Sequence, residues 1–197
     1  MERVGAAGAP AHVRDARASD ERLIDTPRLT LEPQCARHAA EMFLVLSDPE
    51  IYRFENAPPA SPEWLYERFI KLETRRSADG SEAWLNWVLR LRSGEPIGYV
   101  QATVDTQGQA LIAYVLASPH WGRGLAQEAL QAMVAELAAQ WQVHRLLAVF
   151  KRGNLRSRRL LERLGFDAGT AAQRALHEVQ DDEDLMQRAL AATVAPP

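Results

Sequence analysis

A glycine-containing loop, residues 121–126, joins a short apolar segment to a long amphipathic one in this chain. The apolar run from Leu111 to Leu116 is typical of a strand. Apolar residues then recur at helical spacing from Leu125 to Trp141, which predicts a long helix with one buried face. A strand that passes through glycines directly into a helix leaves unpaired backbone N–H groups where a ligand can approach closely. The segment therefore predicts a phosphate-binding turn inside an α/β domain.

Two common nucleotide-binding loops are excluded by the residues of this turn. A P-loop ends in Gly-Lys-Ser/Thr, and no such ending is present. The dinucleotide fingerprint requires a third glycine after Gly122 and Gly124, where this chain has Gln127. For the loop taken alone, a tight strand-to-helix turn that binds no ligand remains an alternative.

A second motif lies about 30 residues further along the chain. Asn154 is a favourable N-cap residue, Ser157 falls in the first turn that follows, and Gly165 suits the end of the helix. The stretch from Asn154 to Leu164 therefore predicts a capped helix. Taken alone, this stretch is also compatible with an ordinary capped helix that has no function beyond packing.

The remaining pattern predicts a mixed α/β domain around one sheet, with helices on its faces. Further helices are expected over Cys35–Leu46 and over Pro62–Arg76, the latter with Ser61 as N-cap and with Trp64, Leu65, Phe69 and Leu72 facing inward. Further strands are expected at Arg28–Glu32, Trp84–Leu91, Ile97–Val104, Leu146–Phe150, Arg174–Val179 and Asp184–Leu190.

Length and composition predict one domain of ordinary size. The chain has 197 residues, of which 47% are hydrophobic and 25% charged, a normal mixture for a globular protein. Residues 1–22 contain almost no large apolar side chains and predict a mobile tail, so the domain is expected over 23–192. A formal net charge of −3 argues against a general nucleic-acid binder.

The same composition bears on location and on metals. A single cysteine, Cys35, forms no internal disulfide and has no partner at metal-ligand spacing, so a reducing compartment and no metal site are expected. No apolar run is long enough to span a bilayer, and the first residues lack a secretory apolar core. The sequence therefore predicts a cytoplasmic protein that does not enter membranes.

The two motifs, in this order and at this spacing, resemble those of the GNAT superfamily of N-acetyltransferases. In that family the pyrophosphate loop follows a Q/R-x-x-G-x-G/A pattern, whose last two places are occupied here by Gly124 and Ala126. Trp121 stands where the family usually has Gln or Arg. The stretch from Asn154 to Phe166 is similar to the family's later motif, which starts N-x-x-(A/S) and runs to G-F.

One branch is more similar still, the ribosomal-protein N-terminal acetyltransferases and their relatives. Its members commonly begin with a stretch like Thr26-Pro27-Arg28-Leu29-Thr30-Leu31, and they share an Ile97-Gly98 strand, a Tyr114-x-Leu116 strand and a W-G-x-G-x-A loop. The resemblance covers about Ile24 to Leu190 and implies the GNAT fold, a single mixed and mostly antiparallel sheet flanked by helices.

The resemblance implies acetyl-CoA as co-substrate and assigns roles to individual residues. Backbone groups of Leu116 and Ala117 are expected to pair with the pantetheine arm, which lies between splayed strands. The cradle from Trp121 through Gly122, Arg123, Gly124 and Leu125 to Ala126 is expected to hold the pyrophosphate through backbone N–H groups, and the Arg123 side chain is either a phosphate ligand or a solvated surface group. Asn154 and Ser157 are expected on the thiol side of the coenzyme.

Two positions depart from the family pattern, and both concern proton transfer. The strand position that often holds a glutamate base is Leu111, and the usual tyrosine position before Gly165 is Leu161. Ser157 is then the best candidate for the acid, or for a hydrogen-bond donor to the thiol. Weaker candidates for the base are Asp105, Glu55, Glu82 and His120.

The sequence leaves the acceptor open within one class, a primary amine on a peptide or protein N-terminus or on a small molecule. The reaction expected from the resemblance is direct attack of the amine in a ternary complex. Because Leu111 and Leu161 replace residues that usually carry protons, a catalytically silent acyl-CoA-binding sensor or an interaction module is the alternative. Whether the chain forms a homodimer is also open.

Overall fold

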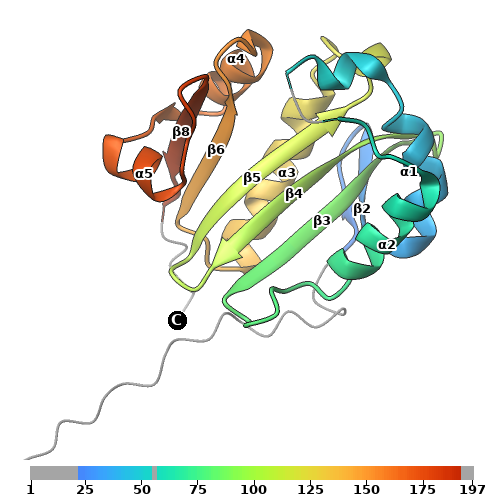
Figure 1. The fold of residues 1–197 in the computed structure, drawn as a ribbon, viewed down its shortest axis with the longest axis horizontal. Coiled ribbons are helices and arrows are strands. Elements are labelled where there is room, and N and C mark those ends of the chain that lie inside the picture. The colour runs from blue at the N-terminus through green and yellow to red at the C-terminus, as the bar shows by residue number, and fades with distance from the viewer. Residues whose placement is uncertain (1–21, 55–56, 192–197) are drawn as a thin grey trace, which may run out of the picture.

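The computed structural model describes residues 22–54 and 57–191, and these form a mixed α/β fold with one sheet (Figure 1). The strand order is β1-β2-β3-β4-β5-β6-β8-β7, and among the described strands only β5 and β6 pair in parallel. The strands are β1 (Ile24–Asp25), β2 (Leu29–Pro33), β3 (Glu82–Leu91), β4 (Pro96–Asp105), β5 (Gln109–Leu116), β6 (Arg145–Lys151), β7 (Asp167–Ala168) and β8 (Glu183–Ala189). The predicted fold class, a mostly antiparallel sheet flanked by helices, is confirmed.

Helices cover both faces of the sheet. The α-helices are α1 (Ala39–Val45), α2 (Pro62–Leu72), α3 (Leu125–Gln140), α4 (Leu155–Arg163) and α5 (Ala171–Leu176), with short 3₁₀ turns η1 (Ala36–His38), η2 (Pro49–Arg53) and η3 (Ser118–His120). The larger core joins one face of the sheet to α3 and α4, and a smaller core joins the other face to α1 and α2. Figure 1 shows α1 and α2 in front of the sheet and α3 behind it.

The alternation of side chains along the strands explains the two cores. On β4, Val100, Ala102 and Val104 are buried against the α3 face, while Tyr99 packs toward α1 and α2. The predicted long helix is confirmed as α3, whose apolar stripe lies in the larger core.

Three details of the predicted pattern are wrong. The segment Arg174–Val179 is not a strand, because Thr170 and Gln173 form a capping box that starts α5. Helix α2 stops at Leu72 rather than at Arg76, and Arg75 has a left-handed backbone with φ 61°. Trp64 does not face inward, since it is 48% exposed on α2. The predicted tail over residues 1–22 lies outside the described residues except for Arg22, and the domain bounds 23–192 stay a prediction.

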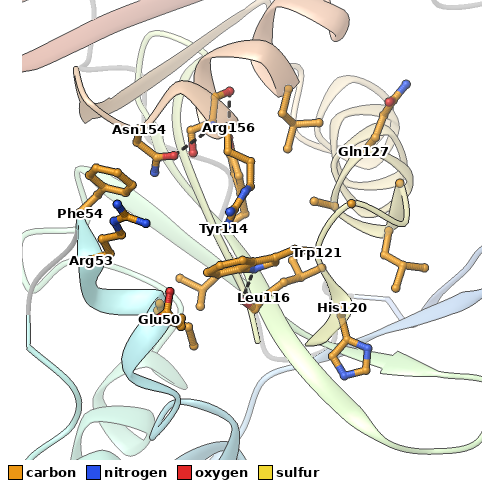
Figure 2. A pocket seen from close by; sticks show the side chains of 18 of the residues that line it. Glu50, Arg53, Phe54, Tyr114, Leu116, His120, Trp121, Gln127, Asn154 and Arg156 are labelled. Atoms are coloured by element: carbon orange, nitrogen blue, oxygen red, sulfur yellow. Dashed lines mark hydrogen bonds between the residues drawn. The ribbon is translucent and has the colours of Figure 1, made fainter. Parts of the chain in front are cut away.

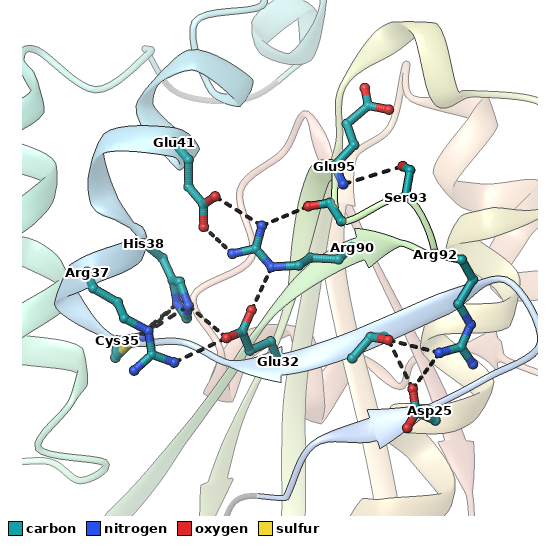
Figure 3. A network of polar contacts seen from close by, with 12 residues as sticks. Asp25, Glu32, Cys35, Arg37, His38, Glu41, Arg90, Arg92, Ser93 and Glu95 are labelled. Atoms are coloured by element: carbon teal, nitrogen blue, oxygen red, sulfur yellow. Dashed lines mark hydrogen bonds and ion pairs between the residues drawn. The ribbon is translucent and has the colours of Figure 1, made fainter.

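A cluster of charged side chains fixes α1 to the edge of the sheet (Figure 3). Arg90 on β3 donates from Nε to Glu32 on β2 at 2.6 Å, and its guanidinium also pairs with Glu41 on α1. Burial raises the pKa of Glu32, but hydrogen bonds from Arg90 and Arg37 outweigh it and lower this pKa to about 2. The network therefore ties β2, β3 and α1 together through the guanidinium of Arg90.

This lowered pKa predicts a loss of stability in acid. The folded chain binds fewer protons at Glu32 than the unfolded chain, so the contribution is complete above pH 4.5 and is lost as the pH falls toward about 2. The full contribution is about 3 kcal/mol. Urea unfolding near neutral pH and at about pH 3 should show a larger drop for the wild type than for Glu32→Gln. Equal drops in the two proteins would contradict this prediction.

Candidate active site

Strands β5 and β6 separate partway along their length. They pair only where Gln109, Ala110 and Leu111 meet the start of β6, while β6 pairs with β8 along its whole length. Figure 1 shows the two strands diverging from this short contact toward α4. The edge of β5 from Ile112 to Leu116 is therefore left without a neighbouring strand.

The register of β4 and β5 decides which backbone groups face this open edge. The N–H of Ala117 donates to Ile97 O at 2.9 Å, and Gly98 pairs with Leu116 one step along. In an antiparallel ladder this arrangement turns the N–H and C=O of Leu116 away from β4. The Leu116 carbonyl accepts the indole N–H of Trp121 at 2.7 Å. The backbone N–H of Leu116 is therefore the group that faces the gap and can bond to a ligand.

The loop after β5 forms the predicted cradle of backbone N–H groups. Gly122 and Gly124 have left-handed φ angles of 73° and 75°, which glycine adopts without strain. Within the described residues, the N–H groups from Gly122 to Gln127 make no backbone or side-chain hydrogen bond, and the N–H of Glu128 is the first to bond, to Gly124 O at 3.1 Å. These free donors lie at the positive end of α3, which suits an anionic oxygen.

Thr26 and Arg28, which precede β2, contact α3 and the loop from outside the cavity lining. The Glu128 carboxylate on α3 accepts hydrogen bonds from Thr26 Oγ1 at 2.7 Å and from Arg28 Nε at 2.6 Å. Arg28 Nη1 also donates to the carbonyl of Arg123 in the loop at 2.8 Å. Burial raises the pKa of Glu128, and the bonds from Thr26 and Arg28 lower it further than burial raises it, so Glu128 stays ionised. Thr26 and Arg28 of the Thr-Pro-Arg-Leu stretch therefore hold the loop in position.

The open edge and the cradle border one cavity of about 550 Å³ (Figure 2). Of the predicted residues, Leu116, Trp121, Gly122, Gly124, Leu125, Ala126, Asn154 and Ser157 line it. Ala117 and Arg123 are not among its lining residues. The N–H and C=O of Ala117 bond to Ile97 and His120, and an Arg123 guanidinium nitrogen lies 3.4 Å from His120 Nδ1.

Helix α4 supplies the wall opposite the cradle. Asn154 caps it as predicted, because its Oδ1 accepts the N–H of Ser157 at 3.1 Å. The hydroxyl of Tyr114 on β5 donates a long hydrogen bond, 3.5 Å, to the Ser157 carbonyl. Two hydroxyl-bearing residues, Tyr114 and Ser157, therefore meet in the cavity where β5 and α4 approach each other.

Trp121 connects the walls of the cavity. Its indole N–H bonds to Leu116 on β5, and the guanidinium carbon of Arg156 on α4 lies 3.7 Å from the centre of its ring. A cation over an indole face is a favourable contact. Trp121, which stands where the family usually has Gln or Arg, thus holds Arg156 of α4 at the cavity.

Sequence reasoning missed the wall formed by η2. Glu50, Arg53 and Phe54 all line the cavity. Asp48 places them there, because one carboxylate oxygen caps the N–H of Glu50 at 3.0 Å and the other accepts the N–H of Ser118 at 2.6 Å. The residues Ser47-Asp48-Pro49 indicate a turn here from the sequence alone. The contact of Asp48 with Ser118 joins positions 70 residues apart, so no short stretch of sequence indicates it.

The predicted proton carriers are scattered. The Asp105 carboxylate accepts the N–H groups of Gln107 and Gln109. Asp105 and Glu82 are neighbours in the register of β4 and β3, at the end of the sheet opposite Leu116. His120 lines the cavity, and Glu55 lies outside the described residues.

The two leucine positions also lie apart from the cavity. Leu161 is 1% exposed in the core, and Leu111 lies 37% exposed on β5. Glu50 lines the cavity and was missed by the sequence argument, and Tyr114, named there only as part of a strand, lines it with Arg156 and Arg163 of α4. Among the described residues, no group of three or more His, Cys, Asp and Glu side chains is arranged to hold a metal, and no helix is long and apolar enough to cross a bilayer.

Comparison with known proteins agrees with this geometry. The acetyltransferase (GNAT) domain family matches residues 28–167. A curated protein of Bacillus licheniformis, uncharacterized N-acetyltransferase p20, is 28% identical over 143 residues, which cover 72% of this chain and 80% of that protein.

Two solved structures share the fold. RimL, a ribosomal L7/L12 alpha-N-protein acetyltransferase in complex with coenzyme A, has a TM-score of 0.73 at 17% identity and covers 87% of this chain and 99% of its own. A GnaT-family acetyltransferase from Bordetella pertussis has a TM-score of 0.65 at 27% identity and covers 86% of this chain and 100% of its own. Because the family match covers most of the chain, from β2 through the cradle to α4, this chain belongs to the GNAT acetyltransferase family.

Proposed function

We propose that the protein transfers the acetyl group of acetyl-CoA to a primary amine, the α-amine of a peptide or protein or the amine of a small molecule. The observation that carries the proposal is the shared cavity, in which the open edge of β5 and the free N–H groups of the cradle lie together. The open edge of β5 can pair with an extended thioester arm, and the free N–H groups of the cradle can bind a pyrophosphate. RimL, which shares the fold, is solved in complex with coenzyme A.

In this proposal the backbone does most of the binding. The N–H groups from Gly122 to Ala126 hold the pyrophosphate, with the N–H of Leu125 in the first turn of α3. Arg156, held over the Trp121 ring, adds a positive charge at the opposite wall. The N–H of Leu116 pairs with the pantetheine arm or polarises the thioester carbonyl, and Asn154 lies on the thiol side. When bound, acetyl-CoA supplies the activated acetyl group.

The amine must lose a proton and the departing thiolate must gain one. Glu50 is the one carboxylate among the described residues that line the cavity, and in this proposal it accepts the amine proton through water. Ser157 donates to the sulfur, with Tyr114 beside it as a second hydroxyl. Attack is direct, with amine and acetyl-CoA bound at the same time.

The role of Ser157 predicts a change in turnover without a change in coenzyme affinity. Ser157→Ala should lower kcat for amine-dependent CoA release by about 100-fold, because a positioned proton donor contributes at least that much. Calorimetry should give an unchanged Kd for acetyl-CoA, because the cradle is intact. Ser93→Ala, in the exposed hairpin between β3 and β4, is the matched control. Wild-type turnover by Ser157→Ala would remove this serine from the reaction.

The second candidate is a catalytically silent acyl-CoA-binding module. The observation that favours it is the leucine at each position where the family usually carries a proton, Leu111 and Leu161. A thiol-release assay with a panel of peptide and small-molecule amines separates the two. Tight binding of acetyl-CoA without release of CoA in the presence of any amine would favour the silent module.

A further inference from the structure

A second hollow, of about 240 Å³, lies on the face of the sheet opposite α3. It is lined by Arg68, Lys71 and Leu72 from α2, by Trp84 and Asn86 from β3, and by Gln101, Ala102 and Thr103 from β4. The smaller core under α1 and α2 includes Val88 and Tyr99, and the hollow begins beside it, where the sheet residues are polar. In Figure 1 the strands between α2 and α5 have no helix in front of them.

The hollow leads toward the gap between β5 and β6. Gln101 pairs with Ala113 on β5, and Thr103 pairs with Leu111. Strands lie about 4.8 Å apart and residues advance about 3.4 Å along a strand, so Leu116, one strand across from Gln101 and three residues along β5 from Ala113, is about 11 Å from it. Ala113 carries a small side chain on this path. A molecule that reaches from the hollow to the gap therefore crosses only β5.

The charges that line the hollow have one sign. Arg68 and Lys71 are exposed, and within the described residues neither makes an ion pair. Their contacts are with aromatic rings, Arg68 over Trp64 at 5.7 Å and Lys71 over Trp84 at 5.9 Å. The nearby carboxylate of Glu82 does not line the hollow and accepts the indole N–H of Trp84 at 3.0 Å. Two cations without a carboxylate partner favour an anionic occupant.

The polar floor of the hollow has the same preference. Gln101 and Thr103 have no side-chain partner within the described residues, and both can donate to a carboxylate oxygen. A sheet face that packs against a helix usually carries aliphatic side chains, whereas this part of the face carries an amide and a hydroxyl group at the bottom of a hollow. Amide, hydroxyl and cationic groups together match a carboxylate that arrives with its hydration shell partly removed.

We infer that the hollow binds an acidic side chain of the acceptor, and that the acceptor is a peptide or protein N-terminus with a carboxylate about three residues from its α-amine. The spacing follows from the distance, because an extended chain advances about 3.4 Å per residue and Gln101 in the hollow is about 11 Å from Leu116. This inference rests on the proposed function, since it places the amine at the acetyl group. It adds the chemical class of the acceptor.

The test compares two peptides that begin Ala-Gly-Glu-Glu and Ala-Gly-Gln-Gln. The wild type should acetylate the acidic peptide with a kcat/KM up to about fivefold higher, the effect of one exposed ion pair. Lys71→Glu and Arg68→Glu should each abolish this preference, while Arg22→Glu, which makes the same change in net charge away from the hollow, should keep it. The Kd for acetyl-CoA should be the same in all four proteins.

Binding of the peptides is measured separately from turnover. Fluorescein-labelled peptides are titrated with protein saturated with CoA, and anisotropy gives each Kd. Turnover of both peptides at equal kcat/KM, with equal Kd values, would overturn the inference and leave the proposed function standing. Tighter binding of the acidic peptide, lost in Lys71→Glu, would support the inference even without CoA release, and the proposed function would then be the part that fails. Absence of binding by both peptides would overturn the inference.

Discussion

Gly124→Glu is expected to weaken acetyl-CoA binding by about 100-fold or more, below detection by calorimetry. Gly124 has a φ of 75°, a left-handed conformation that glutamate adopts only with strain. It also lies at the N-cap of α3, beside the N–H groups that are free to bind phosphate oxygens. A Cβ at this position would lie 3.4 Å from Arg28 Nη2, so the glutamate also competes for the guanidinium that holds the Arg123 carbonyl of the loop. Its carboxylate adds a negative charge beside the bound pyrophosphate.

The control for this variant is Gly80→Glu. Gly80 has nearly the same backbone angle, φ 72°, and a Cβ there meets no atom within 4 Å. It lies in a turn before β3, away from the cavity lining. Gly80→Glu should therefore carry the same backbone strain and bind acetyl-CoA normally. Normal binding by Gly124→Glu would show that the coenzyme is not held by this loop.

Gly98→Ala is expected to destabilise the protein by about 3 kcal/mol, at the upper end of the range for forcing a carbon into a packed site. A Cβ at Gly98 would lie inside van der Waals distance of Val115 O and 2.9 Å from Leu116 Cα. Both are backbone atoms, so β5 must shift to make room. Because Leu116 offers its N–H to the cavity, the shift should also weaken acetyl-CoA binding.

Urea unfolding of Gly98→Ala and Gly94→Ala separates crowding from backbone strain. Gly94 has a φ of 89° in the hairpin between β3 and β4, and a Cβ there meets nothing within 4 Å. Its replacement should cost only about 1 kcal/mol, the penalty for a left-handed alanine. Equal free energies of unfolding for the two variants would show that β4 and β5 are not packed as closely as described.

Much of the site follows from local sequence signals. The turn before α3 depends on two glycines and on the helical spacing that begins at Leu125, and both are visible in a short window. The cap of α4 is equally local, since Asn154 and Ser157 are three residues apart. Such features are predictable because the interactions that make them lie within one turn of helix.

The rest of the cavity depends on contacts that no short window contains. The η2 wall reaches the cavity through Asp48, which bonds to Ser118, and Arg156 reaches it over Trp121. The residue pattern alone also does not show where β5 separates from β6, although the family resemblance implies splayed strands; β6 keeps its pairing with β8 along its full length while β5 leaves it after Leu111.

The errors in the fold have a local origin. The capping box of Thr170 and Gln173 starts a helix where the pattern over Arg174–Val179 predicts a strand. Trp64 is apolar, but it is 48% exposed and contacts Arg68 on its own helix rather than the core. Leu161 is instructive in the other direction. Its buried position on α4 means that a change at this site alters packing in the core rather than the lining of the cavity.

Amide hydrogen exchange with and without acetyl-CoA tests the central claim most directly, because the site consists largely of backbone N–H groups. On binding, exchange should slow at Gly122 to Gln127 and at Leu116, with no change in the hairpin around Gly94. Calorimetric binding of acetyl-CoA without protection of these amides would contradict this site, and would place the coenzyme somewhere other than the gap between β5 and β6.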